Sequence, residues 1–334
     1  LIKLSKIHFI FTIIYLFRKK SSVLLQWAKK CAIIISKHKT EKTQMNNIKI
    51  TATKLILLLL LSIPAQIIVS FAIGLIPQSG LSSNMRNYII PQIIYPLLFE
   101  VPYLLIAKNS IASFLPTPVK KVSVIKTASA TFAFMFAAIF TSTVYARLLN
   151  AIRIVKPIKS ASFTTDNIFE AVLWIIAMAI LPPVLEEAVF RGAILGTMKQ
   201  YMGRDAIFFS AALFALMHAN FNQIPVAFCM GLILGWFAYS TGSIVVPIIL
   251  HTCNNLISVG YSLLSGVLEE KALARTDLIL TAAISLIGLC CAIYEIISFA
   301  KKIKNEPKEE KGAVKAAFFT PSFIFYTAIM LGLA

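Results

Sequence analysis

Long apolar runs separated by short polar or charged stretches extend over most of the chain. Nine such runs cover residues 54–76, 88–107, 123–147, 168–198, 206–221, 224–240, 244–264, 276–298 and 317–334. A helix that crosses a bilayer needs roughly 17–25 apolar residues, whereas the strands of a membrane barrel show shorter segments of alternating polarity. The pattern predicts an all-α fold, a polytopic transmembrane helical bundle with about eight or nine membrane helices.

The composition supports a membrane protein. Hydrophobic residues make up 58% of the 334 residues, charged residues make up 14%, and the mean hydropathy is +0.81. A soluble domain of this size needs a polar shell that this composition cannot supply. We therefore expect an integral membrane protein in contact with the lipid bilayer.

Charge divides the chain into four predicted segments. Residues 1–44 are basic and precede Met45, so we interpret them as an N-terminal extension. An amphipathic surface helix and an additional span are the alternatives for this extension. Residues 45–300 are predicted to form the membrane domain. The charged stretch 301–316, which contains "KKIKNEPKEEKGAVK", is interpreted as a linker to an additional C-terminal apolar helix over 317–334.

The formal net charge of +18 raises the question of a nucleic-acid partner. Residues 1–44 contribute half of it, because they hold ten Lys/Arg and one Glu, a balance of +9. The sequence shows no nucleic-acid-binding motif and no aromatic stacking set on a basic surface, so we expect no nucleic-acid partner. The five cysteines form no CxxC pair and no disulfide framework.

One apolar run contains charges close together. "LPPVLEEAVFRG" (181–192) carries Glu186, Glu187 and Arg191, although an ionisable residue at membrane depth costs roughly 2.5–3.5 kcal/mol on insertion scales. Pro182 disturbs the helix or begins a new one just before the glutamates. Glu187 and Arg191 are i,i+4 and are predicted to pair. Glu186 is rotated by about 100° from Glu187, so it is available for another role.

Two histidines lie in other apolar runs. His218 follows Phe214 at i,i+4, so the phenyl ring is predicted to cover the imidazole. His251 and Asn255 are also i,i+4 and share a helix face. Because three separate segments each carry a costly polar group, we expect these side chains and Glu186 to converge on one site.

Two further features of the apolar runs bear on packing. Glu100, in "LLFEVPY", is a carboxylate at membrane depth; it lies either at a helix end that reaches the interface or beside a polar partner inside the bundle. Gly231 and Gly235 form a GxxxG pattern, which permits close helix approach in lipid.

The converging groups suffice for hydrolysis of a peptide bond. A carboxylate paired with an imidazole can deprotonate a water molecule. A second imidazole and an amide can donate hydrogen bonds to the oxyanion that forms. We therefore predict four catalytic residues (Glu186, His218, His251 and Asn255), supported by Glu187, Arg191 and Phe214, and no cofactor.

Other chemistries use some of the same residues. Glu186, His218 and His251 could instead form a His₂Glu zinc site with water as the fourth ligand, although no HExxH motif is present. A thiol mechanism would use Cys253, but Cys253 and His251 are i,i+2 and diverge on a helix. A proton-relay transporter is a further alternative, and no inverted repeat is visible to support it.

Three motifs resemble one known family. "EEAVFR", "FALMH" and "HTCNN" are similar to the EExxxR, FxxxH and HxxxN motifs of the type II CAAX prenyl endopeptidases, which include the bacterial Abi-type (CPBP) intramembrane proteases. The resemblance implies a glutamate-dependent intramembrane endopeptidase. In such an enzyme Glu186 is the general base, His218 helps to activate the water, and His251 and Asn255 line the oxyanion site.

The same resemblance bears on partners and location. It implies a peptide or protein substrate, which is lipid-modified in the eukaryotic members, where the last three residues of a prenylated CAAX protein are removed. The bacterial branch implies the cytoplasmic membrane as location and peptide maturation or bacteriocin immunity as context. A non-catalytic scaffold or immunity protein of the same fold stays open as an alternative.

Overall fold

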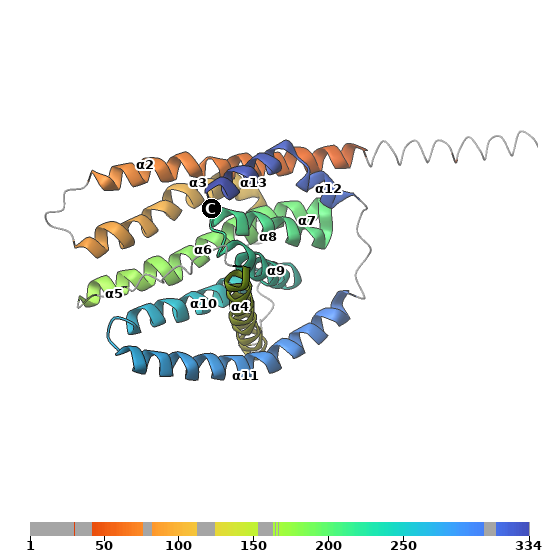
Figure 1. Ribbon diagram of the computed structural model, residues 1–334. Coiled ribbons are helices and arrows are strands. Elements are labelled where there is room, and N and C mark those ends of the chain that lie inside the picture. The colour runs from red at the N-terminus through yellow and green to blue at the C-terminus, as the bar shows by residue number, and fades with distance from the viewer. Residues whose placement is uncertain are drawn as a thin grey trace, which may run out of the picture.

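The computed structural model describes residues 30, 42–75, 82–111, 124–152, 163, 165, 167–303 and 312–333. These residues form helices joined by turns and contain no strand, which confirms the all-α prediction for this part of the chain (Figure 1). A helix over 42–60 is followed by α2 (Ser62–Gly74), η1 (Met85–Ile89), α3 (Ile90–Ile111), α4 (Val124–Ile152), α5 (Ile168–Ile175), η2 (Ile176–Ile180), α6 (Leu181–Glu187), η3 (Ala188–Leu195), α7 (Gly196–Met202), η4 (Gly203–Asp205), α8 (Ala206–Met217), α9 (Ile224–Thr241), α10 (Val245–Leu264), α11 (Glu270–Ile303), α12 (Ala313–Phe318) and α13 (Pro321–Leu333).

Five helical stretches are long and apolar enough to cross a membrane, and the protein is an integral membrane protein with a helical bundle. They are Met85–Leu105, Ile125–Leu149, Ile168–Met217, Ile224–Thr241 and Glu270–Ser298. The other predicted spans are helical in the described residues but shorter or more polar, as in α10 with its histidine and asparagines. The predicted number of about eight or nine spans therefore stays a prediction.

The stretch Ile168–Met217 is too long for a single crossing. A straight helix of its 50 residues would measure about 75 Å, and the hydrocarbon core is roughly 30 Å thick. The chain turns at Gly203, whose φ of 56° lies in the left-handed region that favours glycine. This turn separates the predicted runs 168–198 and 206–221.

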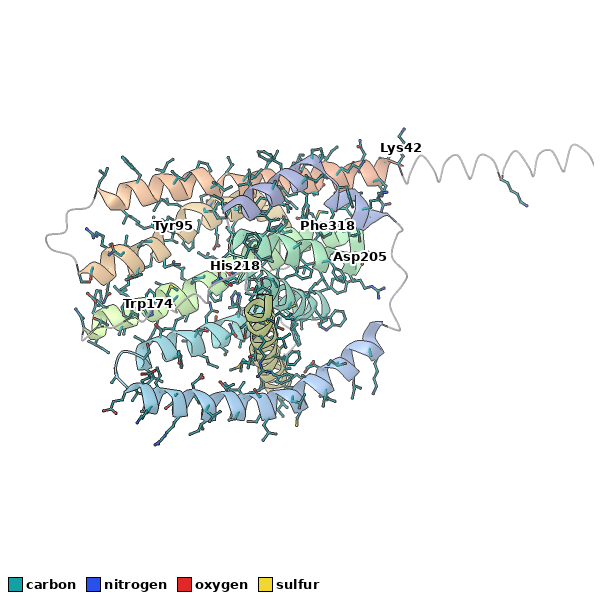
Figure 2. The ribbon with its side chains drawn as sticks, viewed as in Figure 1. Lys42, Tyr95, Trp174, Asp205, His218 and Phe318 are labelled. Atoms are coloured by element: carbon teal, nitrogen blue, oxygen red, sulfur yellow. The ribbon has the colours of Figure 1, made fainter. Side chains whose placement is uncertain are left out.

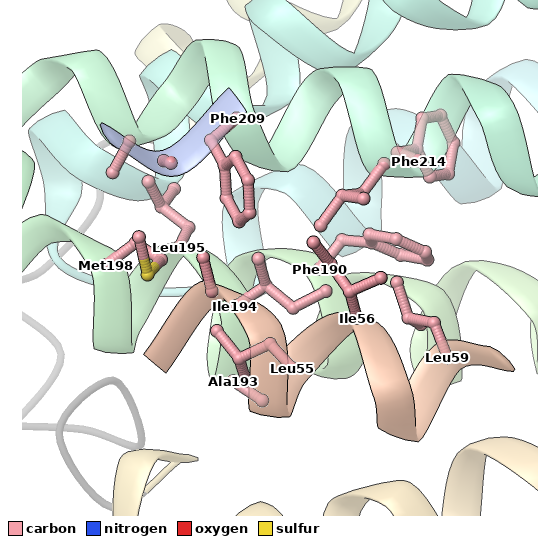
Figure 3. Packing of buried hydrophobic residues seen from close by; sticks show 14 of the residues in the cluster. Leu55, Ile56, Leu59, Phe190, Ala193, Ile194, Leu195, Met198, Phe209 and Phe214 are labelled. Atoms are coloured by element: carbon pink, nitrogen blue, oxygen red, sulfur yellow. The ribbon is translucent and has the colours of Figure 1, made fainter. Parts of the chain in front are cut away.

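The largest core cluster joins segments from both ends of the chain. Leu55, Ile56 and Leu59 of the first helix face Phe190 and Ile194 of η3 (Figure 3). Burial of these apolar side chains against one another excludes lipid and water from the centre of the bundle.

The C-terminal helices belong to the same cluster. The ring centroids of Phe318 and Phe323 lie 5.5 and 5.9 Å from that of Phe209 in α8. The hydroxyls of Ser322 and Thr53 are 3.1 Å apart, which links α13 to the first helix. In Figure 1, α12 and α13 lie along this edge of the bundle, and α11 lies at the opposite edge.

The predicted division of the chain into segments stays a prediction, and the structure adds where two helices end near the linker. Helix α11 continues to Ile303 and α12 begins at Ala313, so both ends of the predicted linker 301–316 are helical. The lysines and alanines at these positions are strong helix formers, which explains why helix extends into the charged stretch. Residues 304–311, and nearly all of the predicted extension 1–44, lie outside the described residues.

Two helix pairs approach closely at glycines. A Cβ atom at Gly231 of α9 would lie 3.0 Å from the Ala211 Cβ of α8, which confirms that the GxxxG pattern permits close packing. Helix α11 packs along α4, where a Cβ at Gly288 would lie 2.5 Å from the Phe132 carbonyl oxygen. In the same pair the Ser129 hydroxyl donates a hydrogen bond of 3.2 Å to the Glu295 carboxylate.

Candidate active site

The two adjacent glutamates lie between two π-helical segments. Helix α6 ends at Glu187, with η2 before it and η3 after it, and Pro182 and Pro183 lie in its first turn. Because Pro182 has no N–H, it cannot donate to the Met178 carbonyl four residues earlier in the stretch. The prolines therefore interrupt the helical hydrogen bonding, in line with the expected disturbance of the helix. Short π-helical stretches are frequent at functional sites, because they re-aim the side chains around them.

Side chains from other helices hold both π-helical segments. The Asn255 amide of α10 donates a hydrogen bond of 3.2 Å to the Met178 carbonyl of η2. The fully buried Ser210 hydroxyl of α8 donates one of 2.7 Å to the Phe190 carbonyl of η3. A buried carbonyl outside the regular helical ladder needs such a donor. The half-buried Asn255 keeps a second amide N–H beyond this contact.

Glu187 is fully buried and accepts two charge-assisted hydrogen bonds on one oxygen. Its Oε1 lies 2.6 Å from the Arg191 Nη1 and 2.9 Å from the His251 Nδ1. The predicted Glu187–Arg191 pair is therefore confirmed. Arg191 is also fully buried, and its Nη2 donates to the Gly231 carbonyl at 3.3 Å. Mutual pairing compensates the two charges that would be costly to bury alone.

His251 contacts both glutamates. Because its Nδ1 donates to Glu187, its Nε2 is left to face Glu186, whose Oε2 lies 3.9 Å away. This distance is longer than a direct hydrogen bond. The prediction that Glu186 is separate from the Glu187–Arg191 pair is therefore incomplete. The two nitrogens on opposite edges of one imidazole each meet one carboxylate.

His218 lies at the C-terminal end of α8, near the middle of the bundle (Figure 2). Its Nδ1 is 2.9 Å from the Phe214 carbonyl oxygen, and a carbonyl can only accept, so Nδ1 carries a proton; in the neutral imidazole Nε2 is then the acceptor. The following residue, Ala219, has a φ of 43°, a strained backbone conformation for a residue with a side chain. Among the contacts of the described residues, His251 rather than His218 approaches Glu186.

Phe214 covers more of the site than predicted. Its ring meets the imidazole of His218 edge to face at 5.0 Å and that of His251 at 5.9 Å. The Arg191 guanidinium carbon lies 4.4 Å from the ring centroid, in cation–π geometry. One phenyl ring therefore fixes the relative placement of η3, α8 and α10.

The zinc alternative requires three side chains placed around one metal ion. Within the described residues, no three His, Cys, Asp or Glu side chains are arranged to hold a metal ion. The Nδ1 atoms of both histidines are engaged, with the Phe214 carbonyl and with Glu187, so each Nε2 is the nitrogen that a metal ion would use. The zinc alternative therefore stays a prediction.

Cys253 faces away from the site. It lines an apolar groove of about 790 Å³ between α4 and α10, and neither His251 nor Glu186 contributes to that lining. This placement agrees with the divergence expected of i,i+2 positions on a helix.

Two backbone carbonyls and one hydroxyl that contact the site residues or their segments do not belong to any motif. The carbonyls of Met178 and Gly231 take part through the backbone, so their side chains carry no signal. Ser210 gives a weak signal, as a single hydroxyl within the apolar stretch "FFSAALF". Each of them acts on a predicted site residue or on the segment that carries it.

Comparison with known proteins identifies relatives of this region. Residues 168–257 match the family model described as type II CAAX prenyl endopeptidase Rce1-like. The membrane-embedded CAAX protease MroQ of Staphylococcus aureus (strain USA300) is 34% identical over 114 residues, which is 32% of this chain. The chain spans about half the length of this curated relative, 46% of it. No solved structure matches significantly. All the predicted site residues lie within the range 168–257.

Proposed function

We propose that the chain is an intramembrane endopeptidase that hydrolyses a peptide bond in a membrane-associated peptide or protein, as the match of residues 168–257 to the type II CAAX prenyl endopeptidase model supports. One observation carries the proposal. A single buried imidazole, that of His251, lies 2.9 Å from one glutamate and 3.9 Å from the next. A structural helix in lipid has no need of this arrangement, because each ionisable group costs free energy to insert.

In the proposed reaction Glu186 is the general base. Its carboxylate takes a proton from a water molecule, and the water oxygen forms a bond to the carbonyl carbon of the substrate. His218, through its accepting Nε2, holds the second hydrogen of that water. The tetrahedral intermediate then collapses, the C–N bond breaks, and Glu186 returns its proton to the leaving amine.

The oxyanion would be stabilised from α10. The hydrogen bond from Nδ1 to Glu187 orients the imidazole of His251, and Nε2, when it carries a proton, is the donor to the oxyanion. The second N–H of Asn255 is the other donor. Glu187, Arg191 and Phe214 position these groups and do not touch the substrate.

The groove between α4 and α10 supports a substrate with an apolar chain. It is lined by side chains such as Phe132, Ile249 and Leu256, and α10 also carries His251 and Asn255. A lipid-modified peptide could place its chain there while its peptide bond lies on the other side of α10. The bacterial cytoplasmic membrane is the proposed location.

The test is cleavage of a farnesylated CAAX-type peptide carrying a fluorophore and a quencher by the purified protein in detergent. Glu186→Gln is expected to lower the rate by about 100-fold or more, the usual contribution of a general base. Glu295→Gln, a change at the α4–α11 contact outside the site, serves as the matched control. Cleavage that survives Glu186→Gln contradicts the assignment of the base.

A chelator separates the proposal from the zinc alternative. Cleavage is expected to continue in the presence of a strong chelator, since the proposed steps use only side chains and water. Loss of cleavage on chelation, followed by recovery with added zinc, would favour the His₂Glu site instead.

A further inference from the structure

The turn between α8 and α9 carries one of the predicted catalytic histidines. Residues 218–223 form this turn, and His218 is the first of them. Ala219, which follows it, is the one residue other than glycine with a positive φ in the described part of the chain, at 43°. Such a backbone conformation costs free energy and persists only where surrounding contacts hold it. The placement of the His218 ring therefore depends on what holds this turn.

Part of the hold comes from hydrogen bonds within the turn. The Asn220 carbonyl accepts from the backbone N–H groups of Gln223 and Ile224, each at 2.9 Å. The Asn220 side-chain oxygen accepts a third hydrogen bond, of 2.9 Å, from the Asn222 N–H. Because these bonds join residues of the turn to one another and to the first residue of α9, they do not tie the turn to another helix.

A contact from α4 supplies such a tie. The half-buried Tyr145 lies near the C-terminal end of α4, and its hydroxyl donates a hydrogen bond of 2.6 Å to the Phe221 carbonyl. This distance is at the short end for a bond from a hydroxyl to an oxygen. Helix α4 already packs on α9, α10 and α11, in part through the buried side chains of Phe134 and Leu234. The hydrogen bond is therefore not needed to hold α4 in the bundle.

We propose that Tyr145 is a positioning residue for His218, because its hydrogen bond to the Phe221 carbonyl holds the turn that carries the imidazole. From the α8 side, the ring is held by the Phe214 carbonyl at 2.9 Å and by the Phe214 ring at 5.0 Å. From the other side, Tyr145 fixes the backbone three residues after His218. The inference rests on the proposed function for its consequence in catalysis, but the hold on the turn can be measured without any substrate.

The position of Tyr145 on α4 separates this role from substrate binding. Phe132 and Met135 of α4 line the apolar groove, whereas Tyr145 does not. Tyr145 is ten residues beyond Met135, which is about 15 Å along a helix. Loss of the Tyr145 hydroxyl should therefore leave binding of an apolar substrate chain in the groove unchanged, and should act on the step in which His218 holds the water.

Hydrogen exchange in detergent tests the hold on the turn. The backbone amides of residues 219–224 should exchange roughly fivefold faster in Tyr145→Phe than in the wild type, because the turn opens more often without the hydrogen bond. The matched control is Tyr294→Phe in α11, a side chain that is 53% exposed. It should exchange these amides as the wild type does. Equal exchange in wild type and Tyr145→Phe overturns the proposal.

The Tyr145→Phe protein is expected to fold. The substitution removes one hydroxyl and keeps the phenyl ring, and the apolar contacts that hold α4 stay in place. Denaturant titration compares its unfolding midpoint with that of Tyr294→Phe, and the two should be close. A midpoint far below that of the control would mean that the bond supports the whole fold rather than the turn, which overturns the proposal.

Cleavage of the farnesylated CAAX-type peptide tests whether the effect passes through His218. Tyr145→Phe should lower kcat by roughly tenfold, since small displacements of catalytic groups are costly, and should leave KM within about twofold. In a His218→Ala background, measured in single turnovers with the enzyme in excess, the same change should have almost no further effect. Tyr294→Phe should cleave as the wild type does. An equal loss in both backgrounds overturns the proposal.

The two proposals fail in different ways. If the wild type does not cleave the peptide while Tyr145→Phe exchanges the turn amides faster, the proposed function fails and the hold of Tyr145 on the turn stands. If cleavage depends on Glu186 while Tyr145→Phe exchanges and cleaves as the wild type does, the role of Tyr145 fails and the proposed function stands.

Discussion

The site helices (α6, η3 and α10) and the α4–α11 pair are packed in lipid by different kinds of contact. In the site helices, α6 is followed directly by the π-helical η3, and the fully buried Glu187 pairs with Arg191 one turn further on and with His251 of α10. The α4–α11 pair consists of two long regular helices, with a close approach at Gly288 and a hydrogen bond from Ser129 to Glu295.

The two regions differ in how many polar groups they bury between helices. In the α4–α11 pair, small residues and apolar contacts are enough to hold the helices together. In the site helices, charged groups find partners both one turn along the same stretch and on another helix, as Glu187 does in Arg191 and in His251. We therefore expect substitutions in the site helices to cost more than matched substitutions in the α4–α11 pair.

The largest expected effect is at Arg191. Arg191→Met should lower the free energy of unfolding by roughly 3–5 kcal/mol, because it leaves the Glu187 charge buried without its partner. Denaturant titration in detergent measures this. Glu295→Gln, the matched change in the α4–α11 pair, should cost about 1 kcal/mol or less. Equal costs at the two positions would remove the distinction between the two regions.

The next largest expected effect on the free energy of unfolding is at Ser210. Ser210→Ala leaves the Phe190 carbonyl buried without a donor and should cost roughly 1–3 kcal/mol. It should also slow cleavage, because η3 carries Arg191 and follows Glu187 directly. Ser129→Ala is the control, since Ser129 is only partly buried. A Ser210→Ala protein as stable and as active as wild type would show that η3 keeps its shape without this bond.

The smallest of the three expected effects on the free energy of unfolding is at Gly288. Gly288→Ala should cost roughly 1–3 kcal/mol from overpacking against the Phe132 backbone, reduced by up to about 1 kcal/mol because alanine favours helix. The cleavage rate should stay unchanged. Gly260→Ala, also within a helix but with open space around the glycine, should be neutral or stabilising. A destabilised Gly260→Ala protein would contradict the packing described for these glycines.

The fold class and the local part of the site could be predicted from the sequence, because both depend on residues that lie close together along the chain. Apolar runs of bilayer length predicted the helices, and an i,i+4 spacing predicted the Glu187–Arg191 pair, which the structure confirms. The same spacing predicted that Phe214 covers His218.

What could not be predicted depends on the register between helices far apart in the chain. Glu187 and His251 are separated by 64 positions, and no periodicity says which turn of α10 faces which turn of α6. The same limit hid the contact of His251 with both glutamates and the position of Glu100, which is 4% exposed, inside the bundle. The π-helical segments were also missed, because they are set by contacts such as that of Ser210 with the Phe190 carbonyl.

The most direct test of the central claim is a double-mutant cycle on Glu186 and His251, with cleavage of the farnesylated CAAX-type peptide as the readout. Groups that act as one catalytic unit give strongly non-additive losses. The rate of the Glu186→Gln, His251→Ala double variant should therefore equal that of the slower single variant to within about threefold. Losses that multiply, so that the double variant is slower by the product of the two single effects, would contradict a shared site.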